Sequence, residues 1–128
     1  MRLLLDTHVL LWWLSDNRRL GATARAAVGD PDNDVYVSAA TVWECAIKRA
    51  LGKLTVPDDL SGEIQRSGFD ALPLGFRHAE AAGALPRHHD DPFDRMLVAQ
   101  AMEEGLTLTS ADPRFGAYGV PLLPAGRR

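Results

Sequence analysis

Hydrophobic and polar positions along the chain fall into alternating blocks that predict strands and helices. Short apolar runs bounded by turn residues indicate buried strands, and apolar positions three and four residues apart indicate amphipathic helices. The strands predicted in this way are 2–5, 34–38, 69–74, 106–110 and 120–124. The predicted helices are 7–14, 22–28, 39–51, 57–67, 77–85 and 92–104.

The order of these elements predicts the fold class. Strands that alternate with helices favour a parallel sheet with crossover helices on both faces, so we expect one α/β domain over residues 1–128. Hydrophobic residues make up 46% of the chain and charged residues 24%, which is typical of a globular domain. In such sheets ligands bind outside the carboxyl ends of the strands, so a functional site is expected there.

Four acidic residues lie where this edge of the sheet is expected. The first follows the first strand, the second lies in the second turn of the third helix, the third in the first turn of the last helix, and the fourth just beyond the fourth strand. They are Asp6, Glu44, Asp94 and Asp112. Carboxylates brought together repel one another unless a cation neutralises them, and oxygen ligands favour Mg²⁺ or Mn²⁺ over zinc. The pattern therefore predicts a divalent metal site.

Each acid also has a purely structural interpretation. Asp6 is suited to cap the helix that follows it, and Glu44 fits a capping box with Thr41. Asp94 suits the dipole at a helix N-terminus, as does Asp91, which lies directly before a proline and is predicted to be the N-cap, and Asp112 suits a turn. Caps alone do not explain why four separate elements each bring an acid to one edge, so the metal site is the favoured interpretation.

Net charge and cysteine content narrow the range of functions. A formal charge of −3 argues against a generic binder of polyanions. The single cysteine, Cys45, excludes an internal disulfide and fits the reducing cytoplasm, and no apolar run is long enough to cross a membrane. His88 and His89 suggest zinc, but this interpretation is disfavoured because neither a cysteine partner nor a helical histidine pair accompanies them.

Four stretches in this order resemble PIN-domain proteins, and closely resemble the VapC toxins of bacterial type II toxin–antitoxin pairs. They are LLLDTHVLLWW, VSAATVWECAIK, DPFDRMLVAQA and LTSADPRF, and the match runs from Asp6 to Phe115. The resemblance implies a three-layer PIN-like fold in which helices flank a five-stranded parallel sheet of order 3-2-1-4-5. It also implies an Mg²⁺- or Mn²⁺-dependent endoribonuclease that hydrolyses RNA phosphodiester bonds with a metal-activated water.

The resemblance assigns roles to particular residues. On the family pattern the catalytic, metal-binding acids fall on Asp6, Glu44, Asp94 and Asp112. Asp91 is a further acid of the DPFDR subgroup, and whether it or Asp94 reaches the metal directly stays open at this point. Thr7 and Ser110 occupy positions where family members often place hydroxyls that hydrogen-bond the carboxylates or metal waters.

An acidic pocket that receives RNA needs basic side chains around it. The candidate phosphate contacts are Lys48, Arg49, Arg95 and Arg114. Arg95 is equally suited to pair with a neighbouring carboxylate. The resemblance further implies a homodimer and a cognate VapB-type antitoxin, and a partner surface is expected beside Leu11 if one of the three tryptophans stays exposed there.

The main alternative is a PIN-like domain that has lost catalysis and only binds RNA or protein. The intact set of acids argues against it, and titration of Mg²⁺ or Mn²⁺ against thermal stability and RNA cleavage distinguishes the two. A haloacid-dehalogenase-type phosphatase is disfavoured because the second acid that it needs, two residues after Asp6, is replaced by His8.

Overall fold

The computed structural model describes residues 1–127 and contains the predicted succession of strands and helices. The strands are β1 (Arg2–Leu5), β2 (Asp34–Ser38), β3 (Asp70–Leu72), β4 (Thr107–Ser110) and β5 (Leu122–Pro124). The helices are α1 (Thr7–Leu14), α2 (Ala22–Gly29), α3 (Ala39–Ala50), α4 (Leu60–Arg66), α5 (Phe76–Ala84), α6 (Pro92–Glu104) and the 3₁₀ helix η1 (Pro113–Tyr118).

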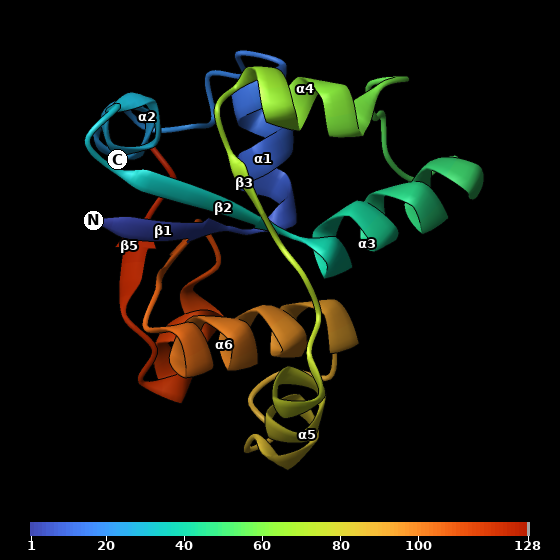
Figure 1. Cartoon of the computed structure of the whole chain (residues 1–128), viewed down its shortest axis with the longest axis vertical. Helices are drawn as coiled ribbons and strands as arrows, with labels where there is room; N and C mark the ends of the chain where they lie inside the picture. Colours follow the sequence, from blue (N-terminus) through green and yellow to red (C-terminus); the bar gives the residue numbers. More distant parts are fainter. Residues whose placement is uncertain (128) are drawn as a thin grey trace.

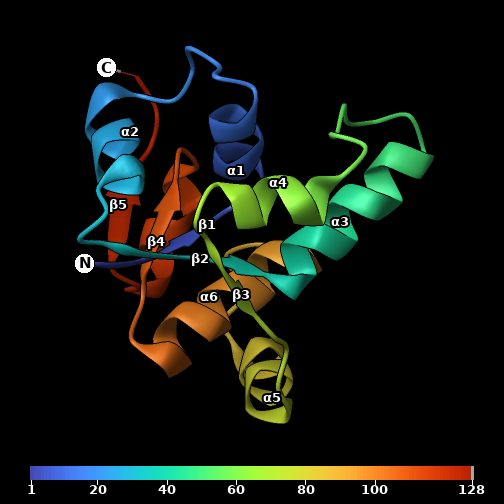
Figure 2. The ribbon, with the colours of Figure 1, turned by 45° about the horizontal axis from the view of Figure 1, so that its top comes forward.

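The strands form one parallel sheet of order β3-β2-β1-β4-β5, which confirms the predicted fold class and strand order. At its centre, Leu4 of β1 pairs with Tyr36 of β2 and Leu108 of β4. Figure 1 shows α1, α2 and α4 on one side of the sheet and α5 and α6 on the other, so the fold has three layers. The carboxyl ends of β1 and β2 lie on the side where α3 begins, and Figure 2 shows α3 projecting away from the sheet beyond that edge.

The apolar run of β1 serves a hydrophobic core on each face of the sheet. Successive side chains of a strand point to opposite faces. Leu3 and Leu5 therefore join the core beneath α1 and α2, whereas Leu4 joins the core beneath α6. All three leucines are fully buried. Because both faces of the central strand are covered, β1 is apolar throughout its buried part and becomes polar only where it ends, at Asp6.

Helix α6 begins and ends where its sequence predicts. The Asp91 side chain accepts hydrogen bonds at the N-terminus, Pro92 occupies the first helical position, and Gly105 closes the helix with a left-handed φ of 66°. The N-cap prediction for Asp91 is therefore confirmed. This places Asp94 in the first turn of a helix whose N-terminus lies at the carboxyl edge of the sheet.

Three local predictions differ from the structure. Helix α4 begins at Leu60 with Asp59 as its N-cap, not at residue 57. The capping box of Thr41 with Glu44 is wrong, because α3 begins earlier and Ser38 is its N-cap. Residues 113–118 form a short 3₁₀ helix instead of a simple turn, and Asp112 caps it.

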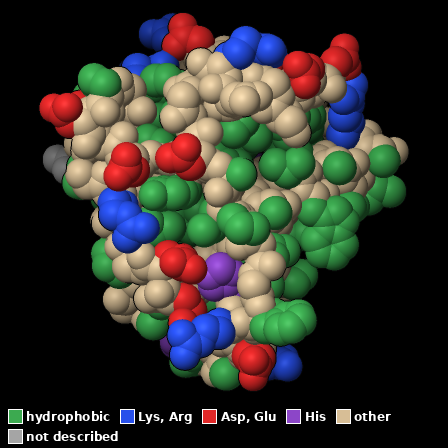
Figure 3. Space-filling view, viewed as in Figure 1, with side chains coloured by type: hydrophobic (Ala, Val, Ile, Leu, Met, Phe, Trp, Pro, Cys, Tyr) green, Lys and Arg blue, Asp and Glu red, His purple; other side chains and the backbone are tan. Residues whose placement is uncertain are grey.

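The exposed aromatic surface lies elsewhere than expected. Leu11 packs against the core together with Trp12 and Trp13, so the prediction of a patch beside Leu11 is wrong. Trp43 on α3 is the exposed tryptophan, at 61%, and it meets Phe93 of α6 edge-on at 5.4 Å between ring centroids. Figure 3 shows hydrophobic side chains gathered across the middle of one face, over β3 and α3. Within the described chain, no helix combines the length and apolarity needed to span a bilayer.

Candidate metal centre and active site

Asp6 lies at the end of β1, where the strand passes directly into α1. One carboxylate oxygen accepts the backbone N–H of Val9 at 2.8 Å, so Asp6 is the N-cap of α1. The other oxygen accepts a hydrogen bond from the Ser110 hydroxyl at the end of β4. Burial is the main cause that raises the pKa of Asp6. Asp6 can therefore cap α1 and also serve a metal site, because the cap uses only one of its two oxygens.

Glu44 enters the same pocket from α3. Its side chain is buried, and its two oxygens accept from the Thr7 hydroxyl and from the Lys48 ammonium group, each at 2.5 Å. The hydrogen bond to Glu44 is the main cause that raises the pKa of Lys48. Thr7 and Ser110 therefore both hydrogen-bond pocket carboxylates, as the family resemblance implied.

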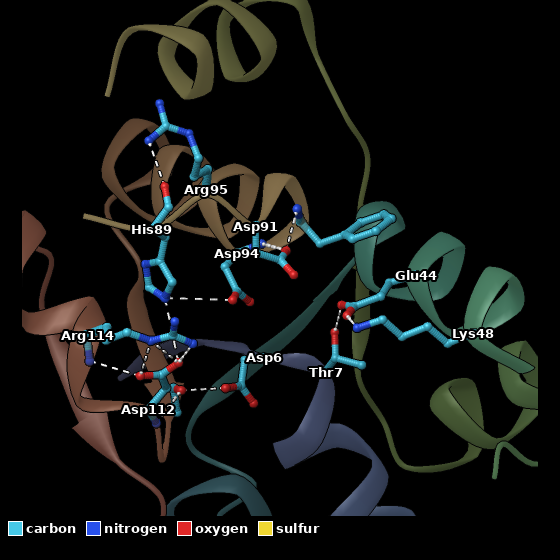
Figure 4. A network of polar contacts seen from close by, with 12 residues as sticks. Asp6, Thr7, Glu44, Lys48, His89, Asp91, Asp94, Arg95, Asp112 and Arg114 are labelled. Atoms are coloured by element: carbon cyan, nitrogen blue, oxygen red, sulfur yellow. Dashed lines mark hydrogen bonds and ion pairs between the residues drawn. The ribbon is translucent and has the colours of Figure 1, made fainter. Parts of the chain in front are cut away.

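Asp94 points into the centre of the pocket from the first turn of α6 (Figure 4). Its carboxylate accepts no hydrogen bond from residues 1–127, although the His89 ring lies 3.7 Å away. Burial, followed by repulsion from four surrounding carboxylates, raises the pKa of Asp94 to about 7. In decreasing order of effect these carboxylates are Asp91, Glu44, Asp6 and Asp112. The acids predicted from four separate elements therefore converge on Asp94.

Asp91 lies beside Asp94 but has a different role in the fold. Its Oδ1 atom accepts the backbone N–H groups of Phe93 and Asp94, at 2.9 and 3.0 Å. These two bonds fix Asp91 as the helix cap, whereas Asp94 carries an unbonded carboxylate. Both cap bonds end on Oδ1 of Asp91, so they do not decide between Asp94 and Asp91 as the acid that reaches a metal.

Asp112 lies beyond β4 and is held by its neighbour Arg114. The Arg114 guanidinium donates to both carboxylate oxygens, with its Nη2 atom 2.8 Å from Oδ2. This hydrogen bonding to Arg114 is the main cause that lowers the pKa of Asp112 to about 2. Asp112 therefore carries its negative charge throughout the physiological pH range.

His89 is a pocket residue that sequence reasoning missed. Its Nε2 atom lies 3.7 Å from Oδ2 of Asp94 and 3.6 Å from Oδ2 of Asp112, and its side chain is only 1% exposed. The sequence did carry a signal, the histidine pair just before the DPFDR motif, but this was set aside for lack of a cysteine partner. The acids that face His89 are supplied by α6 and by the segment after β4, which sequence spacing did not reveal.

The four basic residues predicted to contact phosphate separate into two groups. Lys48 and Arg114 lie at the pocket and are paired with its acids. Arg49 pairs instead with Asp58, in the segment before α4. Arg95 turns away from the acids (Figure 4) and donates to backbone carbonyls at the end of α5 and in the connection to α6. Neither predicted role of Arg95, phosphate contact or carboxylate pairing, agrees with this geometry.

The donor set of the pocket fits a divalent cation. The carboxylates that surround it belong to Asp6, Glu44, Asp91, Asp94 and Asp112, and its cations are Lys48 and Arg114. Negative charge is therefore in excess. Potential ligand atoms of His89, Asp94 and Asp112 all lie within 4.8 Å of one another. Carboxylate oxygens are the ligands that Mg²⁺ and Mn²⁺ prefer. Burial is the main cause that raises the pKa of the Cys45 thiol to about 11. The thiolate, which is the form that binds metals, is therefore scarce at neutral pH, and we leave Cys45 out of the ligand set.

Fold and pocket together define the class of protein: a three-layer α/β domain with carboxylates gathered at the carboxyl edge of a parallel sheet. A family model described as PIN domain matches residues 3–121. The chain belongs to the PIN-domain family, which confirms the resemblance found in its sequence.

Individual relatives are similar over nearly the whole chain. Ribonuclease VapC22 of Mycobacterium tuberculosis is 29% identical over 121 residues, with 92% of each protein covered. A chain of VapBC2 from Rickettsia felis, bound to a DNA fragment from their promoter, has a TM-score of 0.72 at 13% identity and covers 98% of this chain and 99% of its own. A toxin–antitoxin complex from Klebsiella pneumoniae has a TM-score of 0.63 at 21% identity, with 94% of both chains covered. At these identities the two structural matches show the shared fold alone.

Proposed function

We propose that the protein is an Mg²⁺- or Mn²⁺-dependent endoribonuclease and the toxin of a type II toxin–antitoxin pair, acting in the cytoplasm. The observation that carries this proposal is the convergence of acids from β1, α3, α6 and the start of η1 on Asp94, whose pKa is raised to about 7. Carboxylates that repel one another in a partly buried pocket are arranged to bind positive charge. Membership of the PIN family and the name of the VapC22 relative support ribonuclease activity.

The residues proposed to hold the cation are Asp6, Glu44, Asp94 and Asp112. A divalent cation bound there supplies Lewis-acid chemistry, in that it lowers the pKa of water and stabilises charge on phosphate oxygens. The protein contributes orientation: Ser110 fixes Asp6 and Thr7 fixes Glu44 through hydroxyl hydrogen bonds.

Two cations of the pocket are suited to receive the anionic substrate. Lys48 and Arg114 are partly exposed while they pair with Glu44 and Asp112, so they can share their charge with an RNA phosphate. We propose that Glu44 or Asp94 accepts the proton that the attacking water releases. We propose cleavage that leaves 5′-phosphate and 3′-hydroxyl ends.

The test compares Asp6→Asn with the wild-type protein in RNA cleavage with added Mg²⁺ or Mn²⁺. Asparagine keeps an oxygen that can accept the Val9 N–H group but removes the charge, so cleavage should fall by at least about a hundredfold while circular dichroism is unchanged. Asp90→Asn is the control, because it is the same substitution at a highly exposed acid beside the DPFDR motif. Undiminished cleavage by the purified Asp6→Asn variant would refute the assignment.

A catalytically silent binding module is the second candidate. One observation favours it: Glu44 and Asp112 are each already paired with a cation of the chain, Lys48 and Arg114. In a silent module neither metal ion supports cleavage. If RNA binds but is left intact with either ion, this candidate replaces the endoribonuclease.

We also propose two protein partners, a VapB-type antitoxin and a second copy of the chain. Two of the similar structures are those of a VapBC protein and of a toxin–antitoxin complex. A groove of about 820 Å³ lies between α3, α4 and the edge strand β3, and its lining includes Val42, Ile64 and Leu72. At the start of α5, Phe76 is 90% exposed. Unpartnered apolar surface of this kind is typical of a protein that binds another chain.

A further inference from the structure

Neighbouring residues hold the His89 side chain in place. Its ring stacks on Tyr118, with 5.7 Å between centroids and 10° between planes, and lies 5.0 Å from the Phe115 ring. Arg95 donates to the His89 backbone carbonyl at 3.4 Å, to the carbonyls of Leu85 and Pro86 in the same connection, and to that of Ala82 in α5. Aromatic packing and a clamped backbone therefore fix the direction of the imidazole.

Neither nitrogen of this buried ring has a hydrogen-bond partner within residues 1–127. A buried polar group without a partner destabilises a fold, so such groups in proteins almost always meet a partner, a water or an ion. Most of the described buried side chains of the pocket, including Asp6, Thr7 and Glu44, are hydrogen-bonded. The unpaired ring therefore points to a ligand.

The distances indicate what that ligand is. Nε2 lies 3.7 Å from Asp94 Oδ2 and 3.6 Å from Asp112 Oδ2, which is too long for hydrogen bonds. Metal–ligand bonds of about 2.1 Å in octahedral geometry place adjacent ligands about 3 Å apart and opposite ligands about 4 Å apart. The separations around His89 lie between these two values, so shifts of about 0.6–0.7 Å bring Nε2 to the adjacent spacing from both oxygens.

We infer that His89 is a nitrogen ligand of the cation in this pocket, so that the centre is a mixed imidazole–carboxylate site and not an all-oxygen site. This inference rests on the proposed metal-dependent function and adds a ligand to it. His89, Asp94 and Asp112 would hold the cation together, and they belong to the α5–α6 connection, α6 and the segment after β4.

A nitrogen ligand changes which ion the site prefers. Mg²⁺ is a hard cation that strongly favours oxygen, whereas transition-metal ions accept imidazole readily. His89 therefore favours Mn²⁺ over Mg²⁺. Replacing it by phenylalanine, which keeps the ring packing, should weaken Mn²⁺ binding by about ten- to a hundredfold and Mg²⁺ binding by less than about threefold.

The experiment uses the full-length chain without a histidine tag, loaded with Mn²⁺ in a buffer free of imidazole. Pulsed electron paramagnetic resonance detects coupling between Mn²⁺ and a directly bound nitrogen, and ¹⁵N-histidine labelling assigns that coupling to histidine. We expect the coupling in wild-type protein and in His88→Phe, and its loss in His89→Phe. His88 is the matched control because it is the exposed neighbour of His89 and also packs against Tyr118, with its ring edge-on to the Tyr118 ring.

The outcomes separate this inference from the proposed function. Histidine coupling that only His89→Phe abolishes supports the ligand assignment. Tight Mn²⁺ binding without histidine coupling overturns it and leaves the metal-dependent function standing, with His89 as a hydrogen-bond donor to the acids. Equal and negligible Mn²⁺ binding by wild type and Asp94→Asn overturns both. If His89→Phe does not fold, the wild-type and His88→Phe spectra decide together: labelled-histidine coupling that His88→Phe retains supports His89, which is the histidine grouped with these acids in the described chain, and its absence from both spectra overturns the inference.

Discussion

At the scale of single residues, Asp94 shows how the site is built at the expense of stability. Folding buries its carboxyl group among other acids and raises its pKa from 3.8 to about 7. Between these values the folded chain holds a proton that the unfolded chain has released. Because the folded state then binds more protons, the free energy of unfolding falls as the pH rises from about 4 to about 7, and it stays low above pH 7.

The variant Asp94→Asn should remove this penalty. Without metal, in EDTA, we expect it to be more stable than wild type at pH 8 by roughly 2 kcal/mol and nearly equal to wild type at pH 4. The carboxylate accepts no hydrogen bond within the described chain, so the substitution breaks none there. Urea unfolding at the two pH values measures the effect. A variant less stable than wild type at pH 8 would contradict the account.

At the scale of elements, α6 serves both the pocket and the segment that precedes it. Neighbouring positions on a helix point about 100° apart, so Asp94 faces the acids while Arg95 points away from them (Figure 4). There Arg95 donates to the carbonyl oxygens of Ala82, Leu85, Pro86 and His89. One guanidinium thus ties the end of α5 and the α5–α6 connection to α6, and holds His89 beside the pocket.

Replacement of Arg95 by lysine keeps the charge but loses the planar fork of donors that reaches these carbonyls. We expect Arg95→Lys to lower the free energy of unfolding by about 1–3 kcal/mol and to weaken Mn²⁺ binding, because His89 is held less firmly. Urea unfolding and calorimetric titration with Mn²⁺ measure the two effects. Arg87→Lys, at a highly exposed arginine, is the control. Unchanged stability of Arg95→Lys would show that the carbonyl contacts contribute little.

At the scale of the whole molecule, the parallel sheet assembles the site from the ends of the chain. Asp6 and Ser110 lie 104 positions apart in sequence, yet they hydrogen-bond because β1 and β4 are neighbours and end at the same edge. Helix α3 projects beyond that edge (Figures 1 and 2). Because Glu44 belongs to α3, the proposed partner would lie beside the acids if it bound this helix.

Co-expression with the small reading frame adjacent to its gene tests the proposed partners. We expect the two proteins to co-purify, the complex to cleave RNA more slowly than the free chain, and light scattering to give a mass that contains two copies of this chain. Failure of the adjacent protein to co-purify would count against an antitoxin, and a single copy in both preparations would count against the homodimer.

The order and nature of the elements follow from the sequence because they depend on local spacing. The apolar run of β1, the stripe of α3, and the Asp91–Pro92 start and Gly105 end of α6 each act within a few residues. Acids that directly follow strands or open helices were therefore predictable as a group, since parallel strands end at a common edge.

Tertiary structure alone decided which side chains meet inside the pocket. His89, Arg95 and Arg49 lie within or close to the motifs that carry the acids, yet one enters the pocket, one turns back to carbonyl groups and one pairs with Asp58. Their directions depend on the path of the connections and on aromatic rings such as Tyr118, which are distant in sequence. Local spacing fixes where a Cα atom lies along an element, whereas side-chain contacts depend on which surfaces pack around it, and that is settled only when the whole chain has folded.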